Sequence, residues 1–148
     1  MFNRVLLPTD GSDAVTPAVE TAIDIAETYG AKLHVLFIVD PPSSVSSTSD
    51  GFTGLDNLLD GLEEEGQHAT GKVADKAKDS DIETETAVRR GNPHDDILTY
   101  ATENEIALIV MGTHGRTGVK RALLGSVTED VVRHSEIPVL TVHREPEE

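Results

Sequence analysis

The chain has 148 residues, which is enough for one domain with a sizeable buried core. Its 12 lysine and arginine residues stand against 27 aspartate and glutamate residues, giving a formal net charge of −15. This excess argues against a sequence-independent nucleic-acid binder, which needs a basic face, and against a protein that binds anionic membranes. The absence of cysteine excludes disulfides, thiolate zinc sites, iron–sulfur clusters and a cysteine nucleophile.

No segment has the character of a membrane span or a leader. The longest uninterrupted apolar run covers residues 106–111, far fewer than a helix needs to cross a bilayer. The apolar stretch before Pro8 is too short for a signal peptide. The expected location is therefore the cytoplasm.

The acidic residues are spread along the whole chain, while lysine is scarce. A folded and evenly acidic surface is typical of a protein kept soluble in concentrated salt, where self-repulsion is screened. The alternative is an ordinary acidic cytosolic protein. We predict a halophilic protein whose melting temperature rises steeply from low to molar KCl. Thermal scans across a KCl series measure this, and a melting temperature that stays flat or falls would contradict it.

Short apolar, β-branched runs alternate along the chain with helical patterns. The runs predict strands, several of them apolar enough to be buried on both faces, at 4–7, 33–39, 83–88, 106–111 and 139–142. Helical stripes of apolar residues are predicted between them, at 14–29, 55–77, from 92 onward and at 126–134.

Individual residues mark the ends of these helices. Ser12 or Asp13 is the predicted start signal of the first helix, and Gly30 its stop. The second stripe contains three glycines, each of which weakens a helix by about 1 kcal/mol relative to alanine. Asn92 followed by Pro93 is a capping residue with proline in the first turn, so it opens the third helix.

Strands that alternate with helices predict a parallel sheet covered on both faces through right-handed crossovers. Five strands in this length fit an α/β fold with a single doubly wound five-stranded sheet, Rossmann-like or flavodoxin-like. We expect one domain over residues 1–148. The serine-rich stretch at about 41–54 is predicted to be a flexible surface loop rather than a lid.

In such a sheet, ligands bind beyond the carboxyl ends of the strands, where the strand order reverses. The segments predicted to meet there are 8–12, 38–40 and 111–115. Gly112 and Gly115 follow a buried strand, and Gly125 with Ser126, the expected N-cap, opens the last helix. A glycine turn beside a helix N-terminus predicts a phosphate cradle made of backbone donors.

The charge pattern supports an anion site at the same place. Residues 106–128 contain no acidic side chain, although acids are frequent elsewhere in the chain. The same window holds Arg116, Lys120 and Arg121. On so acidic a protein, a polyanion can bind only where the local electrostatic potential is less negative, and this stretch is such a place. The alternative interpretation is a loop that is basic by chance.

These motifs resemble the universal stress protein family. The pattern Gly112-x2-Gly115-x9-Gly125-Ser126 looks like the family's nucleotide-binding signature. Further segments that resemble the family are 5–12, 91–97, 109–116, 124–128 and 137–142. The resemblance covers nearly the whole chain apart from the serine-rich loop, and the motifs taken together are specific, whereas a lone glycine pair is weak.

The resemblance implies an adenine nucleotide alpha hydrolase-like fold and binding of ATP, or of ADP or AMP, with Mg²⁺ or Mn²⁺ bridging the phosphates. It also implies a homodimer paired through the last strand, Val139–Val142. Around adenine it places Asp10 and the main chain of Pro8 and Ile38. Near the ribose and phosphates it places Gly112, Gly115, Arg116, Thr117, Gly125, Ser126 and Val127, and the same stretches add Thr9, Met111 and His114 to the expected site.

Two residues have competing interpretations. Asp10 is expected to face the ligand, although it could instead cap the first helix. His114 either faces the ligand or is solvated.

The function implied is a nucleotide-dependent regulatory module of the stress response. The main alternative is a slow ATPase or another nucleotide-dependent enzyme, for which Asp10 is the one candidate general base. No G-x4-G-K-[ST] loop occurs in the chain, so the phosphate-binding lysine of that motif is missing. A third interpretation is a flavodoxin-like electron carrier or a phospho-acceptor receiver. The small number of aromatic residues argues against a flavin site. The end of the third strand, Val88-Arg89-Arg90, has no aspartate to accept a phosphoryl group, which argues against a receiver.

Overall fold

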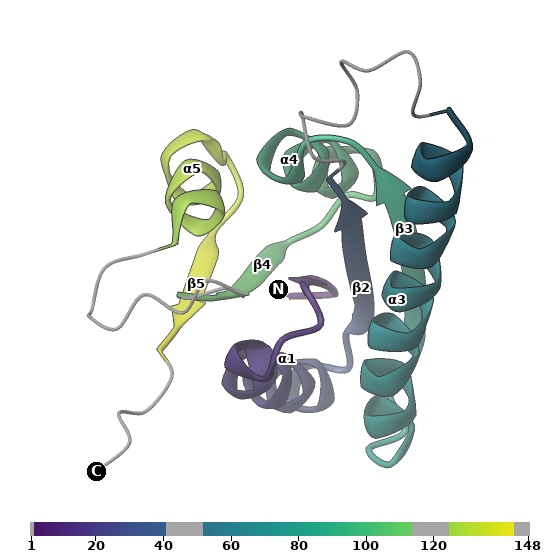
Figure 1. Ribbon diagram of the computed structural model, residues 1–148. Helices are drawn as coiled ribbons and strands as arrows, with labels where there is room; N and C mark the ends of the chain where they lie inside the picture. Colours follow the sequence, from purple (N-terminus) through teal and green to yellow (C-terminus); the bar gives the residue numbers. More distant parts are fainter. Residues whose placement is uncertain (1, 41–51, 114–124, 144–148) are drawn as a thin grey trace, which may run out of the picture.

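The computed structural model describes residues 2–40, 52–113 and 125–143. Strands and helices alternate along these segments (Figure 1). In chain order the elements are β1 (Arg4–Pro8), the 3₁₀ turn η1 (Asp13–Val15), α1 (Thr16–Tyr29), β2 (Lys32–Val39), α3 (Phe52–Lys78), β3 (Thr84–Arg90), α4 (Pro93–Glu103), β4 (Leu108–Gly112), α5 (Ser126–His134) and β5 (Val139–Val142). None of the described helices is long and apolar enough to cross a membrane.

The strands form one five-stranded sheet in the order β3-β2-β1-β4-β5. Every neighbouring pair is parallel. The central strand β1 is apolar and buried over most of its length, as are its neighbours β2 and β4, because helices cover both of their faces. The predicted doubly wound α/β fold is confirmed.

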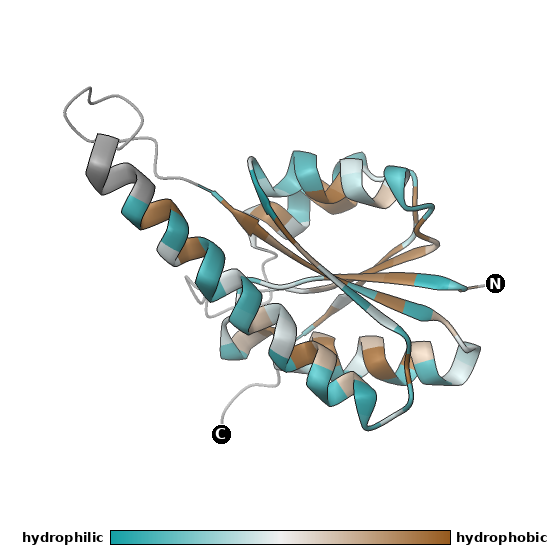
Figure 2. Cartoon of the chain, turned by 90° about the vertical axis from the view of Figure 1, so that its right-hand side faces the viewer, coloured by the Kyte–Doolittle hydropathy of each residue, from teal (hydrophilic) through white to brown (hydrophobic). Residues whose placement is uncertain are grey.

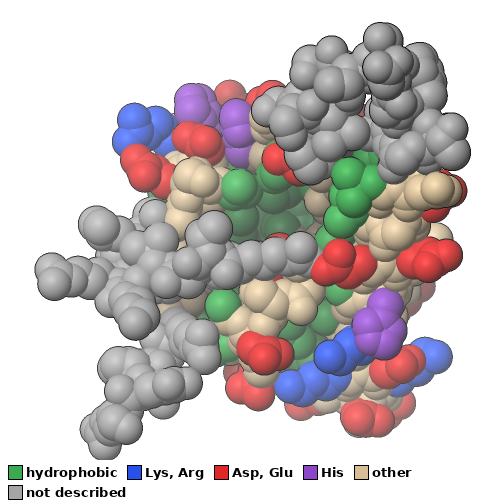
Figure 3. Space-filling view, in the orientation of Figure 1, with side chains coloured by type: hydrophobic (Ala, Val, Ile, Leu, Met, Phe, Trp, Pro, Cys, Tyr) green, Lys and Arg blue, Asp and Glu red, His purple; other side chains and the backbone are tan. Residues whose placement is uncertain are grey.

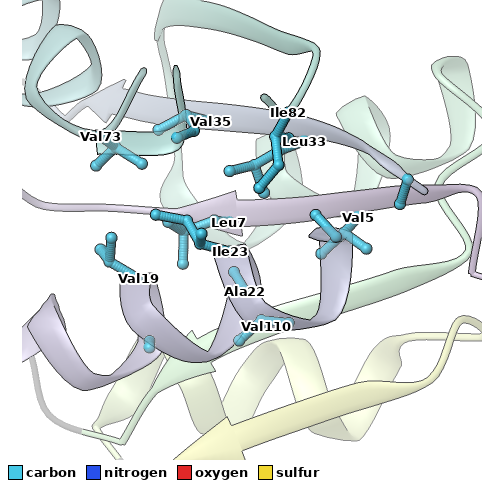
Figure 4. Close-up of a cluster of buried hydrophobic side chains, with 14 of the residues drawn as sticks. Val5, Leu7, Val19, Ala22, Ile23, Leu33, Val35, Val73, Ile82 and Val110 are labelled. Carbon is cyan, nitrogen blue, oxygen red and sulfur yellow. The ribbon is translucent and has the colours of Figure 1, made fainter. Parts of the chain in front are cut away.

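Alternation along the strands divides the core into two layers, one on each side of the sheet. Val5 and Leu7 pack with apolar residues of α1 and α3 (Figure 4), whereas Leu6 points to the opposite face and packs with α4 and α5. In Figure 2 the apolar colour runs through the strands and along the sheet-facing sides of the helices. Helices therefore pack on both faces of the sheet, and this packing positions its strand ends.

Several helix ends agree with the sequence. Gly30 ends α1 in the left-handed conformation, with φ of 63°. The side chain of Asn92 accepts a hydrogen bond from the Asp95 amide at 3.3 Å and so caps α4. The close approach of α3 to β2 gives Gly66 a packing role, because a Cβ atom there would lie 2.7 Å from the Phe37 ring.

Three sequence predictions need correction. Neither Ser12 nor Asp13 caps α1 with its side chain, because the chain first makes the η1 turn and α1 begins only at Thr16. The N-cap of α5 is Gly125, and Ser126 is its first helical residue. The second helix starts before the predicted residue 55, since α3 already begins at Phe52, and residues 41–51 of the serine-rich stretch lie outside the described part.

Candidate functional site

A cavity of about 410 Å³ opens at the carboxyl ends of β1 and β4, where the strand order reverses. Its volume falls within the range of roughly 300–1,000 Å³ that small-molecule sites occupy. The space-filling view shows apolar side chains in a hollow near the middle of this face, with acidic side chains close by (Figure 3). The fold thus places a ligand-sized hollow at the predicted end of the sheet.

One part of the cavity wall is apolar. It comes from η1, from β2, from the first turns of α4 and from the end of β4, through Val15, Leu36, Ile38, Pro93, Ile97 and Met111. The other part is polar and includes Thr9, Asp10, Asp40, Ser126 and Thr128. A wall of this kind suits a ligand with a flat apolar body and a polar extension.

The loop after β1 is held tightly at the cavity. The Thr9 amide donates to the Leu36 carbonyl at 2.9 Å, which joins the loop to β2. The Asp10 carboxylate accepts a hydrogen bond from the Ser12 amide at 2.9 Å, and Gly11 takes a positive φ of 79° between them. Asp10 therefore lines the cavity and also stabilises its own turn.

A second set of hydrogen bonds ties the start of α5 to the end of β4. The Thr128 hydroxyl donates to the Gly112 carbonyl at 2.8 Å, and the Gly125 amide donates to the Thr113 carbonyl at 2.6 Å. The Thr113 amide in turn donates to the Val142 carbonyl of β5 at 3.1 Å. These bonds fix the N-terminus of α5 against the cavity.

The amides that follow Gly125 have no acceptor within the helix. In an α-helix the first N–H groups lack a carbonyl one turn earlier, and the Gly125 cap has no side chain to offer them. Ser126, Val127 and Thr128 carry these amides, and all three line the cavity. Since the Gly125 amide is used by Thr113, the cradle expected from the sequence shifts by one residue toward the helix. Its donors and the positive end of the helix dipole favour an anion there.

All of the predicted site residues that the structure describes line this one cavity. They are Pro8, Thr9, Asp10, Ile38, Met111, Gly112, Gly125, Ser126 and Val127. The predicted residues His114, Gly115, Arg116 and Thr117 lie outside the described residues, as do Lys120 and Arg121. The structure shows the position of the described residues, and their role toward a ligand stays a prediction.

The sequence prediction missed part of the wall, namely Val15, Leu36, Pro93, Ile97 and Thr128, whereas Asp40 belongs to the segment 38–40 that was predicted to meet there. Alternation along β2 could have identified Leu36, because it lies two residues before Ile38 and shares its face of the strand. Pro93 and Ile97 are four residues apart on α4 and so share one face of that helix. No local signal identifies Val15, since the η1 turn carries it to the cavity.

Comparison with known proteins agrees with this geometry. The sequence model of the universal stress protein family matches residues 1–143. The chain belongs to the universal stress protein family. A universal stress protein of Methanocaldococcus jannaschii is 36% identical to it over 148 residues, which cover all of this chain and 86% of the relative.

Solved structures of family members superpose closely on this chain. Universal stress protein UspA from Lactobacillus plantarum has a TM-score of 0.87 and 30% identity, with 95% of this chain and 97% of that chain covered. A universal stress protein crystallised in complex with cAMP has a TM-score of 0.69 and 28% identity, with 96% and 97% covered. Adenine nucleotide binding thus occurs among structural neighbours of this chain.

Proposed function

We propose that this universal stress protein binds an adenine nucleotide, ATP in particular, in the cavity between β1 and β4 and acts as a nucleotide-dependent regulatory module. The observation that carries the proposal is the row of α5 amides at Ser126, Val127 and Thr128 on the cavity wall. Such donors hold phosphate oxygens without a P-loop lysine. Bound phosphates would also bring Mg²⁺ or Mn²⁺, which coordinates through their oxygens.

The remaining walls suit the rest of a nucleotide. The apolar side chains of Leu36, Ile38 and Ile97 offer contact surface for a base. Asp10 and Asp40 are acceptors on the same cavity, and carboxylates favour hydroxyl or amino groups over phosphate. The family member that binds cAMP supports an adenine nucleotide as the ligand class.

Binding is favoured over catalysis by the position of Asp10. The one candidate general base already accepts a hydrogen bond from the Ser12 amide, which fits a carboxylate that shapes the loop. We therefore expect ATP hydrolysis to be slow at most. Single-turnover hydrolysis of labelled ATP tests this, and turnover well above background that disappears in Asp10→Asn would favour the enzyme.

We also propose that the 1–148 domain acts in the cytoplasm and forms a homodimer through β5. This strand lies at one edge of the sheet, so its outer backbone groups have no neighbouring strand within the described part of the chain. Leu140 of β5 is one of the large apolar side chains exposed to solvent. An uncovered edge with exposed apolar residues is a ready site for pairing.

The proposed function is tested by looking for bound nucleotide and by measuring nucleotide binding. The purified protein is denatured and the released small molecules are identified by mass, and the ligand-free protein is then titrated calorimetrically with ATP and magnesium. We expect saturable binding of one nucleotide per chain. A protein that releases no nucleotide on denaturation and gives no heat of binding with ATP and magnesium or manganese would contradict the proposal.

A further inference from the structure

A buried histidine in β2 forms a polar pair with a buried tyrosine of α4. His34 is 3% exposed and Tyr100 is 2% exposed. The His34 Nδ1 atom lies 2.7 Å from the Tyr100 hydroxyl, whereas its Nε2 atom is buried without a hydrogen-bond partner. A polar group buried in this way is uncommon, because leaving it unpaired costs free energy.

The pair continues to the surface through Glu85 of β3. The Tyr100 hydroxyl donates to Glu85 Oε2 at 3.4 Å, and Lys32 Nζ donates to Glu85 Oε1 at 3.0 Å. The Tyr100 hydroxyl can donate to Glu85 and at the same time accept a hydrogen bond from His34 only if the His34 Nδ1 atom carries a hydrogen. A neutral imidazole with its hydrogen on Nδ1 meets this condition. The unpartnered Nε2 then carries a lone pair and no hydrogen.

The charges around His34 come from β1, from β2 and from β3 with the residue just before it, and the Tyr100 hydroxyl of α4 lies beside the imidazole. Burial lowers the pKa of His34 below its ordinary value, and the opposing attraction of Glu85 is the smaller effect. Burial likewise raises the pKa of Tyr100 to about 12. Arg89 lies over the tyrosine ring, 4.7 Å from its centroid. Among the described residues, the charged groups that act on the pair include Arg4, Lys32, Glu83, Glu85 and Arg89.

The pair stands on the two elements that form the apolar wall of the cavity. Residues 34, 36 and 38 share one face of β2, and residues 93, 97 and 100 share one face of α4. Both elements pack in the core layer that contains Leu36, Ile97 and Tyr100. The members of these rows that line the cavity are Leu36, Ile38, Pro93 and Ile97. His34 lies beyond Leu36 on this face of β2 and Tyr100 lies beyond Ile97 on this face of α4, in both cases away from the cavity, and these two residues contact each other.

We propose that the His34–Tyr100 pair sets the distance between α4 and β2 and thereby makes nucleotide affinity depend on the protonation of His34. The inference rests on the proposed function of the cavity. A proton on Nε2 would create a buried N–H group without an acceptor and a buried positive charge. Separating α4 from β2 admits water to this charge, and the same movement spreads the apolar wall.

The direction of the pH dependence follows from which form of His34 the folded protein favours, and this is the neutral form. Because burial disfavours the charged imidazole, His34 stays neutral at and above its ordinary pKa of about 6.5 and gains a proton only at lower pH. We therefore expect affinity to be highest above neutrality and to fall as the pH drops below that value.

The first experiment compares the wild type with His34→Gln by calorimetric titration with ATP and magnesium at about pH 8 and about pH 5. Glutamine can bond to Tyr100 but does not titrate in this range. The phosphate of the nucleotide also titrates, with a pKa near 6, but it does so equally with both proteins. We expect the wild type to lose about fivefold more affinity than the variant over this range.

A second experiment needs no folded variant at His34. The imidazole of His34 is titrated by NMR in the wild type, with and without saturating ATP and magnesium. Coupling is reciprocal, so bound nucleotide must lower the pKa of His34 if the proposal holds. In Tyr100→Phe, which keeps the ring and loses the hydroxyl, this shift should become smaller.

The outcomes separate the two proposals. Failure to bind ATP at about pH 8 would remove the proposed function and this inference with it. Normal binding with parallel pH profiles in wild type and His34→Gln, or an unchanged His34 titration in the presence of nucleotide, would overturn this inference alone.

Discussion

Replacing Gly125 with valine is expected to weaken ATP binding by about a hundredfold while leaving the protein folded. Gly125 caps α5 and lines the cavity, directly before the free amides of Ser126 and Val127. A branched side chain there takes space that the phosphates need and shields those amides. Hydrogen bonds to a charged group contribute roughly 1.5–3 kcal/mol each, so losing them changes affinity strongly.

The backbone at this position accepts the change. Gly125 has φ of −62° and ψ of 156°, an extended conformation that valine adopts readily. The matched control is Gly61→Val, because Gly61 lies in α3 with open space around the position of a Cβ atom. Calorimetry with ATP and magnesium measures both variants, alongside thermal melting. Unchanged affinity in a folded Gly125→Val protein would show that the phosphates do not lie at α5.

Replacing Gly91 with alanine is expected to lower the free energy of unfolding by about 3 kcal/mol. Gly91 joins β3 to α4 with φ of +155°, a conformation that residues with side chains rarely adopt. A Cβ atom there would also overlap the carboxylate of Asp96 in the first turn of α4, but this side chain can rotate away, so the backbone strain is the main cost. The Gly91 amide also donates to the Val39 carbonyl at 2.9 Å, so the turn is held against the sheet and cannot move freely.

Urea unfolding of three proteins separates strain from overlap. Gly30→Ala serves as the control, because Gly30 has φ of +63° and no neighbour near its Cβ position, so only backbone strain of about 1 kcal/mol is expected. The double variant Gly91→Ala with Asp96→Ala should recover part of the loss by removing the overlapping carboxylate. A Gly91→Ala protein no less stable than Gly30→Ala would refute the argument that the backbone at Gly91 is the more strained of the two.

The limits of local sequence signals are visible at the start of α5. Serine is a common N-cap, and the residue types around Ser126 favoured it as the cap. The cap is instead Gly125, whose amide donates to the Thr113 carbonyl, while the Thr128 hydroxyl donates to the Gly112 carbonyl. Both acceptors lie at the end of β4, so a contact between elements decided which residue begins the helix. The same holds for α1, whose start is delayed by the η1 turn.

His34 shows the same limit in the core. A histidine in an apolar strand is visible in the sequence, but its partner lies 66 positions away on α4. Nothing in the local pattern of either residue predicts that they meet, because the meeting depends on how α4 crosses β2. The cavity wall at Ile97, one turn from Tyr100, was missed for the same reason.

The sequence by itself determined the order of strands and helices, the parallel sheet and the end of it that carries the cavity. Those features follow from apolar periodicity, from helix-ending glycines and from the rule that links alternating strands and helices to one sheet topology. Only the tertiary structure decided which amides remain free at α5, which side chains complete the apolar wall and which polar pair lies behind it. These depend on contacts between distant segments, and their geometry is set by packing rather than by the local preferences of each residue.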